Sequence, residues 1–130
     1  MKTFKPLLLV ATLLLLAGCN ASDDELTQEQ QLEELRVLAE ELNEISTSVP
    51  CTNPDDWTFT AVGSKACGGP TGYLPYSIQI DVAAFLEKVE NYRLAQQAYN
   101  ERWEIVSDCS IPARPRGVIC EDGEAVLVFS

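Results

Sequence analysis

The chain contains no histidine, and this absence excludes much of the chemistry on which small enzymes depend. Ser-His-Asp and Cys-His sites activate a nucleophile through an imidazole, which is also the commonest zinc and copper ligand. Basic side chains are scarce too, with nine Lys and Arg against 20 Asp and Glu. The formal net charge of −11 repels polyphosphate, so we expect no nucleic-acid partner. The composition predicts a protein that is not an enzyme.

A hydrophobic run long enough for a membrane span is also missing. The most apolar stretch, residues 7–16, follows Lys2 and Lys5 and is shorter than the roughly 20 residues that cross a bilayer. A basic start followed by such a run is typical of a signal peptide. The run ends in Leu16-Ala17-Gly18-Cys19, which resembles the lipobox of bacterial lipoproteins. The resemblance implies that residues 1–18 are removed and that Cys19 becomes the lipidated membrane anchor. The alternative is an ordinary secretory signal followed by a free cysteine.

The residues after Cys19 bear on location. Asn20 stands where the inner-membrane retention signal of some bacteria has Asp, so we expect the cell outer membrane. The acidic run Ser22-Asp23-Asp24-Glu25 resembles the surface-export signals of some lipoproteins, and a solvated linker explains it equally well. The periplasmic and surface faces both stay open. Residues 19–31 are polar and acidic and are interpreted as a tether.

Four cysteines follow Cys19, namely Cys51, Cys67, Cys109 and Cys120. An even number of cysteines in an exported domain indicates a disulfide framework, and without a CxxC pair a zinc site is a poor fit. Three connectivities are possible. We favour Cys51–Cys67 with Cys109–Cys120, because each closes a short local loop on one side of the long helix predicted next.

Two amphipathic helices are predicted. Apolar residues recur at spacings of three and four over residues 32–47, with glutamates between them, and Thr27 could cap this helix. A longer helix is predicted from its cap Asp81 to about residue 106, because large apolar side chains follow one stripe. The first helix is too short for a coiled-coil dimer and is expected to pack on the second.

Strands are predicted on both sides of the longer helix. Residues 57–62 alternate large apolar and small polar side chains, which indicates a strand. Asp122-Gly123 lies between two apolar runs and is a strong β-hairpin signal. An isolated hairpin is only marginally stable, so the 57–62 strand is predicted to join it in one antiparallel sheet. The fold class is therefore α+β, with two helices on this small sheet and two disulfides.

These elements form one domain, residues 32–130, of which residues 51–130 are the disulfide-rich part. Inside it, the glycine-rich residues 63–73 are predicted to be an irregular loop with positive backbone φ angles. This loop could present a recognition surface or bind an anion through its N–H groups, or its aromatic residues could simply fill the core. The candidate binding residues are Trp57, Lys65, Gly68, Gly69, Tyr73 and Tyr76.

A second hypothesis treats residues 63–73 as the loop of a protease inhibitor. Loops held rigid by cysteines inhibit proteases because less ordering is needed on binding, and Lys65 lies two residues before Cys67. Carboxylates at 55–56, 108 and 121–122 lack the EF-hand spacing, and turn geometry or a solvated surface explains them. We therefore predict no metal ion and no cofactor.

Three segments carry a second resemblance. Gly63-Ser64-Lys65-Ala66-Cys67-Gly68-Gly69-Pro70, Tyr99-Asn100 with Trp103, and Ser107-Asp108-Cys109 are similar to a group of small bacterial outer-membrane lipoproteins. The resemblance extends from about Cys51 onward and implies a location and a length but no activity. The sequence thus predicts a lipid-anchored cell-envelope protein that is a binding or structural component, with an envelope protein as candidate partner. An inhibitor of a protease or other hydrolase is the alternative, and a hydrolase comes third.

Overall fold

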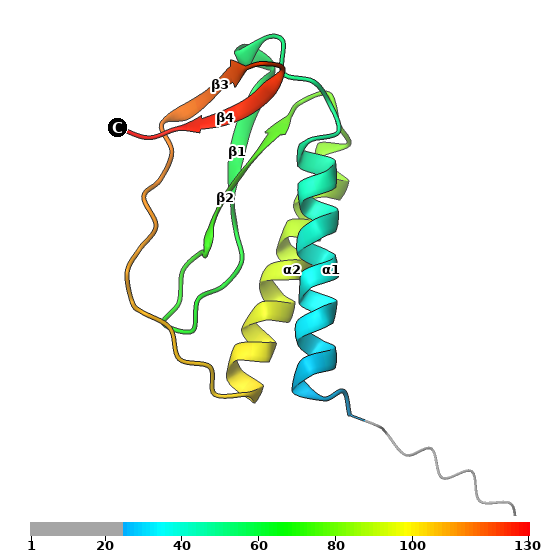
Figure 1. Cartoon of the computed structure of the whole chain (residues 1–130), viewed down its shortest axis with the longest axis vertical. Coiled ribbons are helices and arrows are strands. Elements are labelled where there is room, and N and C mark those ends of the chain that lie inside the picture. Colours follow the sequence, from blue (N-terminus) through cyan, green and yellow to red (C-terminus); the bar gives the residue numbers. More distant parts are fainter. Residues whose placement is uncertain (1–24) are drawn as a thin grey trace, which may run out of the picture.

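The computed structural model describes residues 25–130 and confirms the α+β class (Figure 1). The predicted signal peptide, the lipobox with Cys19, and Asn20 lie outside the described residues. The described elements are α1 (Gln28–Ser46), the 3₁₀ turn η1 (Pro54–Asp56), β1 (Trp57–Val62), β2 (Gly72–Ser77), α2 (Val82–Arg102), β3 (Gly117–Glu121) and β4 (Glu124–Val128).

Helix α1 begins with a capping box. The Thr27 hydroxyl accepts a hydrogen bond from the Gln30 N–H, and the Gln30 side chain accepts one from the Thr27 N–H. Both N–H groups would otherwise lack a partner at the helix start. The prediction of Thr27 as the cap is confirmed, but the helix starts at residue 28 rather than 32. Residues 28–31 therefore belong to α1 and not to the tether.

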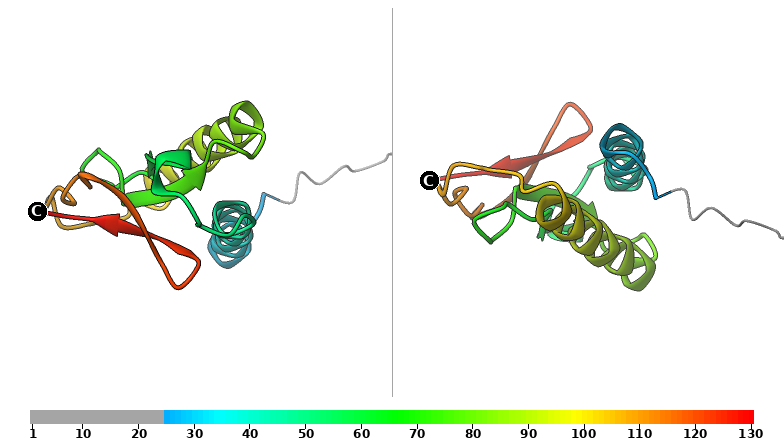
Figure 2. Two further views of the ribbon diagram at one scale, coloured as in Figure 1. Left: turned by 90° about the horizontal axis from the view of Figure 1, so that it is seen from above. Right: turned by 90° about the horizontal axis from the view of Figure 1, so that it is seen from below.

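Helix α2 runs antiparallel to α1, and the two lie side by side (Figures 1 and 2). Asp81 caps it as predicted by accepting a hydrogen bond from the Ala84 N–H, and the helix ends at Arg102, about four residues early. The buried centre is formed by Leu42 of α1 with Phe85 and Val89 of α2. Apolar side chains of the first sheet pack against this centre.

The strand β1 pairs with β2, not with the C-terminal hairpin, so the predicted single sheet is wrong. The two strands form an antiparallel ribbon whose register runs from Trp57 opposite Ser77 to Val62 opposite Gly72. Side chains alternate between the faces of a strand. One face, with Leu74 and Tyr76, packs on the helices, and the other carries Trp57.

Strands β3 and β4 form the predicted hairpin. The turn residues Asp122 and Gly123 have φ angles of 50° and 81°, the combination that favours Asp-Gly in a type I′ turn. The hairpin is a second two-stranded sheet and lies against β1 and β2 (Figure 1). It thus covers the face of the first ribbon that the helices leave free.

The disulfides are Cys51–Cys120 and Cys67–Cys109, so the predicted pairing is wrong. Cys51 follows α1 and reaches the hairpin at one end of the molecule. Cys67, in the loop between β1 and β2, meets Cys109 beyond α2 at the other end (Figure 1). The prediction favoured pairs that close short local loops on one side of α2, whereas packing brings together cysteines 69 and 42 residues apart. We call the end of the molecule that holds Cys51–Cys120 the upper end and the end that holds Cys67–Cys109 the lower end.

Candidate functional site

The binding loop was predicted as residues 63–73, but Gly72 and Tyr73 belong to β2, so the loop that joins β1 to β2 at the lower end is residues 63–71. Three of its glycines have positive φ angles, at Gly63 (77°), Gly68 (92°) and Gly69 (81°), as predicted. Lys65 N–H donates to the Gly69 carbonyl and Gly68 N–H donates to the Lys65 carbonyl, each at 2.9 Å. A Cβ at Gly68 or Gly69 would meet no atom within 4 Å. These two glycines are explained by the turn alone.

The start of the loop is fastened to α2 through both backbone polar groups of Ser64. Its N–H donates to Gln96 Oε1 at 2.7 Å, and its carbonyl accepts from Asn100 Nδ2 at 2.8 Å. Gln96 and Asn100 are one helical turn apart and therefore lie on the same face of α2. The approach is close, since a Cβ on Gly63 would lie 2.7 Å from Gln96 Oε1.

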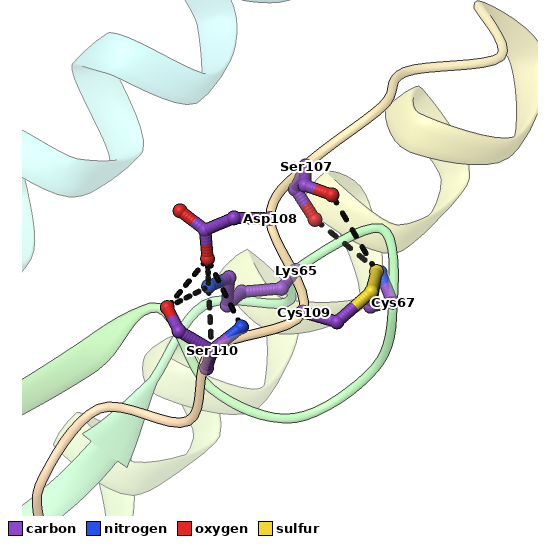
Figure 3. Close-up of a disulfide and its surroundings, with 6 residues drawn as sticks. All are labelled: Lys65, Cys67, Ser107, Asp108, Cys109 and Ser110. Carbon is purple, nitrogen blue, oxygen red and sulfur yellow. Dashed lines mark hydrogen bonds and ion pairs between the residues drawn. A yellow bond between two sulfur atoms is a disulfide. The ribbon is translucent and has the colours of Figure 1, made fainter.

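The middle of the loop is fastened to the segment that follows α2 (Figure 3). Lys65 Nζ donates to Asp108 Oδ1 at 2.5 Å and to the Ser110 carbonyl at 2.7 Å. The Lys65 hydrogen bond, and then those of Ser110, lower the pKa of Asp108 from 3.8 to about 2. The Cys67–Cys109 disulfide lies directly beside this ion pair. The loop and the segment are thus joined covalently and electrostatically.

The segments that carried the second resemblance therefore meet at one place. Residues 63–70, the end of α2, and residues 107–109 form the clamp just described. We call it the loop clamp: the contacts of Ser64 with Gln96 and Asn100, the Lys65–Asp108 ion pair, and the Cys67–Cys109 bond. From the same end of α2, Trp103 Nε1 donates to Gln31 Oε1 at 2.6 Å and ties α1 to it. These residues hold the lower end together.

The six candidate binding residues do not form one surface. Trp57 is buried, and Tyr76 packs in the core, where its ring centroid lies 5.2 Å from that of Phe85. Tyr73 is on the opposite face of the ribbon from Tyr76, since they are three positions apart in the same strand. Gly68 and Gly69 form the exposed loop tip. Lys65 belongs to the loop clamp.

Tyr73 is part of a small aromatic contact outside the core. Its ring meets that of Phe59 edge-on, with centroids 6.0 Å apart and planes at 78°. The Arg114 guanidinium lies over Phe59, 5.6 Å from the ring centre. This stacking holds the irregular segment before β3 against the β1–β2 ribbon.

The geometry of Lys65 bears on the inhibitor hypothesis. Only 15% of its side chain is exposed, and its ammonium has Asp108 and Ser110 as acceptors. A residue that enters the specificity pocket of a protease must project from its loop and give up such contacts. Lys65 would have to break the ion pair first.

A groove between α1 and α2 was not predicted from the sequence. It lies near the lower end and has a volume of about 580 Å³. Its apolar lining includes Leu32, which is 54% exposed, together with Leu35 and Tyr99. The sequence signal was present, because Leu32 begins the apolar stripe of α1, but that stripe was assigned wholly to packing.

Two further observations apply to residues 25–130. Within this range, no group of three or more Cys, Asp and Glu side chains is placed to hold a metal ion. Neither described helix is long and apolar enough to cross a membrane. Comparison of the chain with protein-family models, with curated proteins and with solved structures gave no match.

Proposed function

We propose that the protein is a lipid-anchored component of the cell envelope, attached to the outer membrane through Cys19, which acts by binding. The observation that carries the proposal is that Cys51, Cys67, Cys109 and Cys120 are all used in disulfides. Disulfides persist in oxidising compartments and are rare in the cytosol. They agree with the lipobox-like sequence before Cys19, which provides an address in the same compartment.

The contacts at the lower end argue against catalysis by Lys65, Asp108, Cys67 or Cys109. Lys65 and Asp108 neutralise each other, and the cysteines beside them are oxidised. A nucleophilic enzyme needs a free nucleophile within hydrogen-bond reach of a base. In the loop clamp both cysteines are oxidised and Lys65 is paired with Asp108, so the clamp offers neither a free nucleophile nor a free base. The low exposure of Lys65 also argues against the protease-inhibitor hypothesis.

The lipid anchor is tested by metabolic labelling with an alkyne-bearing fatty acid in a bacterial host. Wild-type protein is expected to incorporate the label, and Cys19→Ser is expected to lose it. The matched control Cys67→Ser retains Cys19 and should remain labelled. An inhibitor of the lipoprotein signal peptidase should cause an unprocessed precursor to accumulate. Absence of label from the wild type, or label that survives Cys19→Ser, contradicts the proposal.

The outer-membrane location is tested by fractionation of the same host. Asn20→Asp places an acidic residue after Cys19, and in a host that reads this as a retention signal the protein should move to the inner membrane. Asn20→Ser serves as the matched control and should not move. A wild-type protein found in the inner membrane would contradict the location but leave the lipid anchor intact.

Binding at the loop tip is tested by capture from native envelope. Ala66 is exposed next to Lys65, so Ala66→Arg changes the surface without touching the core. Thr52→Arg, an exposed position at the upper end, is the matched control. A partner retained by wild type and Thr52→Arg but lost by Ala66→Arg would place binding at the tip. Equal capture by all three would exclude the tip.

A further inference from the structure

We propose that the lower end of the domain docks onto the bilayer that holds the lipid anchor, through the side chains of Val106 and Ile111. This inference rests on the proposed lipidation of Cys19. Val106 is 91% exposed and Ile111 is 86% exposed, more than any other large apolar side chain among residues 25–130. Single exposed apolar side chains are common on protein surfaces, so exposure alone does not carry the proposal.

The segment that carries these two side chains is held in place between them. Asp108 pairs with Lys65, Cys109 is bonded to Cys67, and the Ser110 N–H donates to Asp108 Oδ1 at 3.1 Å. The segment between Val106 and Ile111 is therefore braced against the β1–β2 loop rather than free (Figure 3). A braced segment needs little ordering when it docks, which favours association.

The charge of this segment suits an interface with lipid. Residues 105–113 contain one charged residue, Asp108, although 22% of the chain is charged. The Lys65 ammonium compensates that carboxylate. Glu104 and Arg114 flank the segment with opposite charges. An apolar, nearly neutral surface avoids the repulsion that the rest of this acidic protein would experience at an anionic bilayer.

The attachment point keeps this end close to the membrane. Glu25 lies at the lower end, where it pairs with Arg102 at 3.2 Å. It is six positions from Cys19 in the sequence, and a fully extended chain of that length spans about 20 Å. Helix α2 has 21 residues and is about 30 Å long, so the upper end lies a full helix length farther away. The bilayer is accordingly the occupant that the tether brings to Val106 and Ile111.

The test is nuclear magnetic resonance of the lipidated protein in nanodiscs of phosphatidylethanolamine and phosphatidylglycerol that contain an acyl-chain nitroxide lipid. Docking predicts that the amide signals of residues 105–111 are weakened severalfold more than those near Ile78. Ile78 is also exposed, at 57%, but it lies at the upper end, where its N–H donates a hydrogen bond to the Asp56 carbonyl. Val106→Ser with Ile111→Ser should abolish this local weakening, and the matched control Ile78→Ser should retain it.

Each outcome bears on the proposal. Both altered side chains are exposed, so the double variant is expected to keep Cys67–Cys109 and an unchanged spectrum elsewhere. Weakening spread evenly over all amides, or centred on β3 and β4, overturns docking by this surface. Mass spectrometry of the same sample reports acylation of Cys19 independently. An acylated protein without local weakening overturns docking alone, whereas a protein without acyl groups overturns the lipid anchor as well.

Discussion

Lys65 and Asp108 lie 43 residues apart in the chain and form an ion pair that links the β1–β2 loop to the segment after α2. The two partners differ in exposure, at 15% for the Lys65 side chain and 76% for that of Asp108. An ammonium withdrawn from water needs acceptors, and Asp108 and Ser110 provide them. The contact therefore explains why a charged residue can stand in this tight loop.

The ion pair predicts an acid-dependent loss of stability. The folded state lowers the pKa of Asp108 from 3.8 to about 2, so its contribution is complete above pH 3.8 and is lost as the pH falls toward 2. Urea unfolding of wild type and Asp108→Asn should show a stability difference that shrinks across this window. A difference that stays constant down to pH 2 would contradict the role of Asp108. Added salt should reduce the difference, because the carboxylate is exposed.

Asn100 should matter more for stability than Asn91, an exposed asparagine on the same helix. Asn100→Ala leaves the Ser64 carbonyl without its side-chain donor, and losing a part-buried hydrogen bond costs about 1–3 kcal/mol. Asn91→Ala is the control, since Asn91 is exposed on α2, and its change should stay within about 0.5 kcal/mol. Chemical unfolding measures both. Equal effects would mean that the Ser64 contact does not hold the loop.

Gly63 and Gly68 should differ in their tolerance of a methyl group. A Cβ on Gly63 would lie 2.1 Å from Thr71 Oγ1, in addition to the positive φ. Gly63→Ala should therefore destabilise the protein by more than the roughly 1–2 kcal/mol that the left-handed conformation alone costs. Gly68→Ala has the same backbone penalty but no clash and should cost about that amount. Thermal unfolding compares the two, and the reverse order would contradict the described loop packing.

The disulfide connectivity is directly testable. Non-reducing peptide mapping should recover Cys51 with Cys120 and Cys67 with Cys109. A Cys51–Cys67 peptide would contradict the structure. Removing Cys67–Cys109 by a double alanine substitution should lower the free energy of unfolding by about 4 kcal/mol, because the bond closes a loop of 42 residues.

Local sequence signals predicted the elements whose causes are local. Asp81 caps α2, Thr27 caps α1, and Asp122-Gly123 turns the hairpin, each through bonds within a few residues. Strand β2 was missed because Pro75 and the glycines before it weaken any strand pattern. Its pairing with β1 depends on a partner across the loop rather than on its own sequence.

The sequence predicted the backbone conformation of the candidate loop but not the residues that the loop contacts. The positive φ angles of Gly68 and Gly69 follow from composition, because few other residues adopt them. The partner of Lys65 could not be predicted, since Asp108 is brought near it only after α2 has packed against the ribbon. The same holds for Trp57 and Tyr76, because only the packed structure decides that Tyr76 faces the helices and that Trp57 is buried on the opposite face of the ribbon.

The sequence by itself determined the two helices, the hairpin turn and the acidic charge, because periodicity, caps and composition act over short stretches of chain. The tertiary structure alone decided the two-sheet arrangement and the pairing of Cys51 with Cys120 and of Cys67 with Cys109. The physical reason is that a disulfide forms between the cysteines that packing brings close. In this fold Cys51 and Cys120 lie at the upper end and Cys67 and Cys109 at the lower end. Cysteines that are close in the chain are therefore separated by roughly the length of α2, about 30 Å.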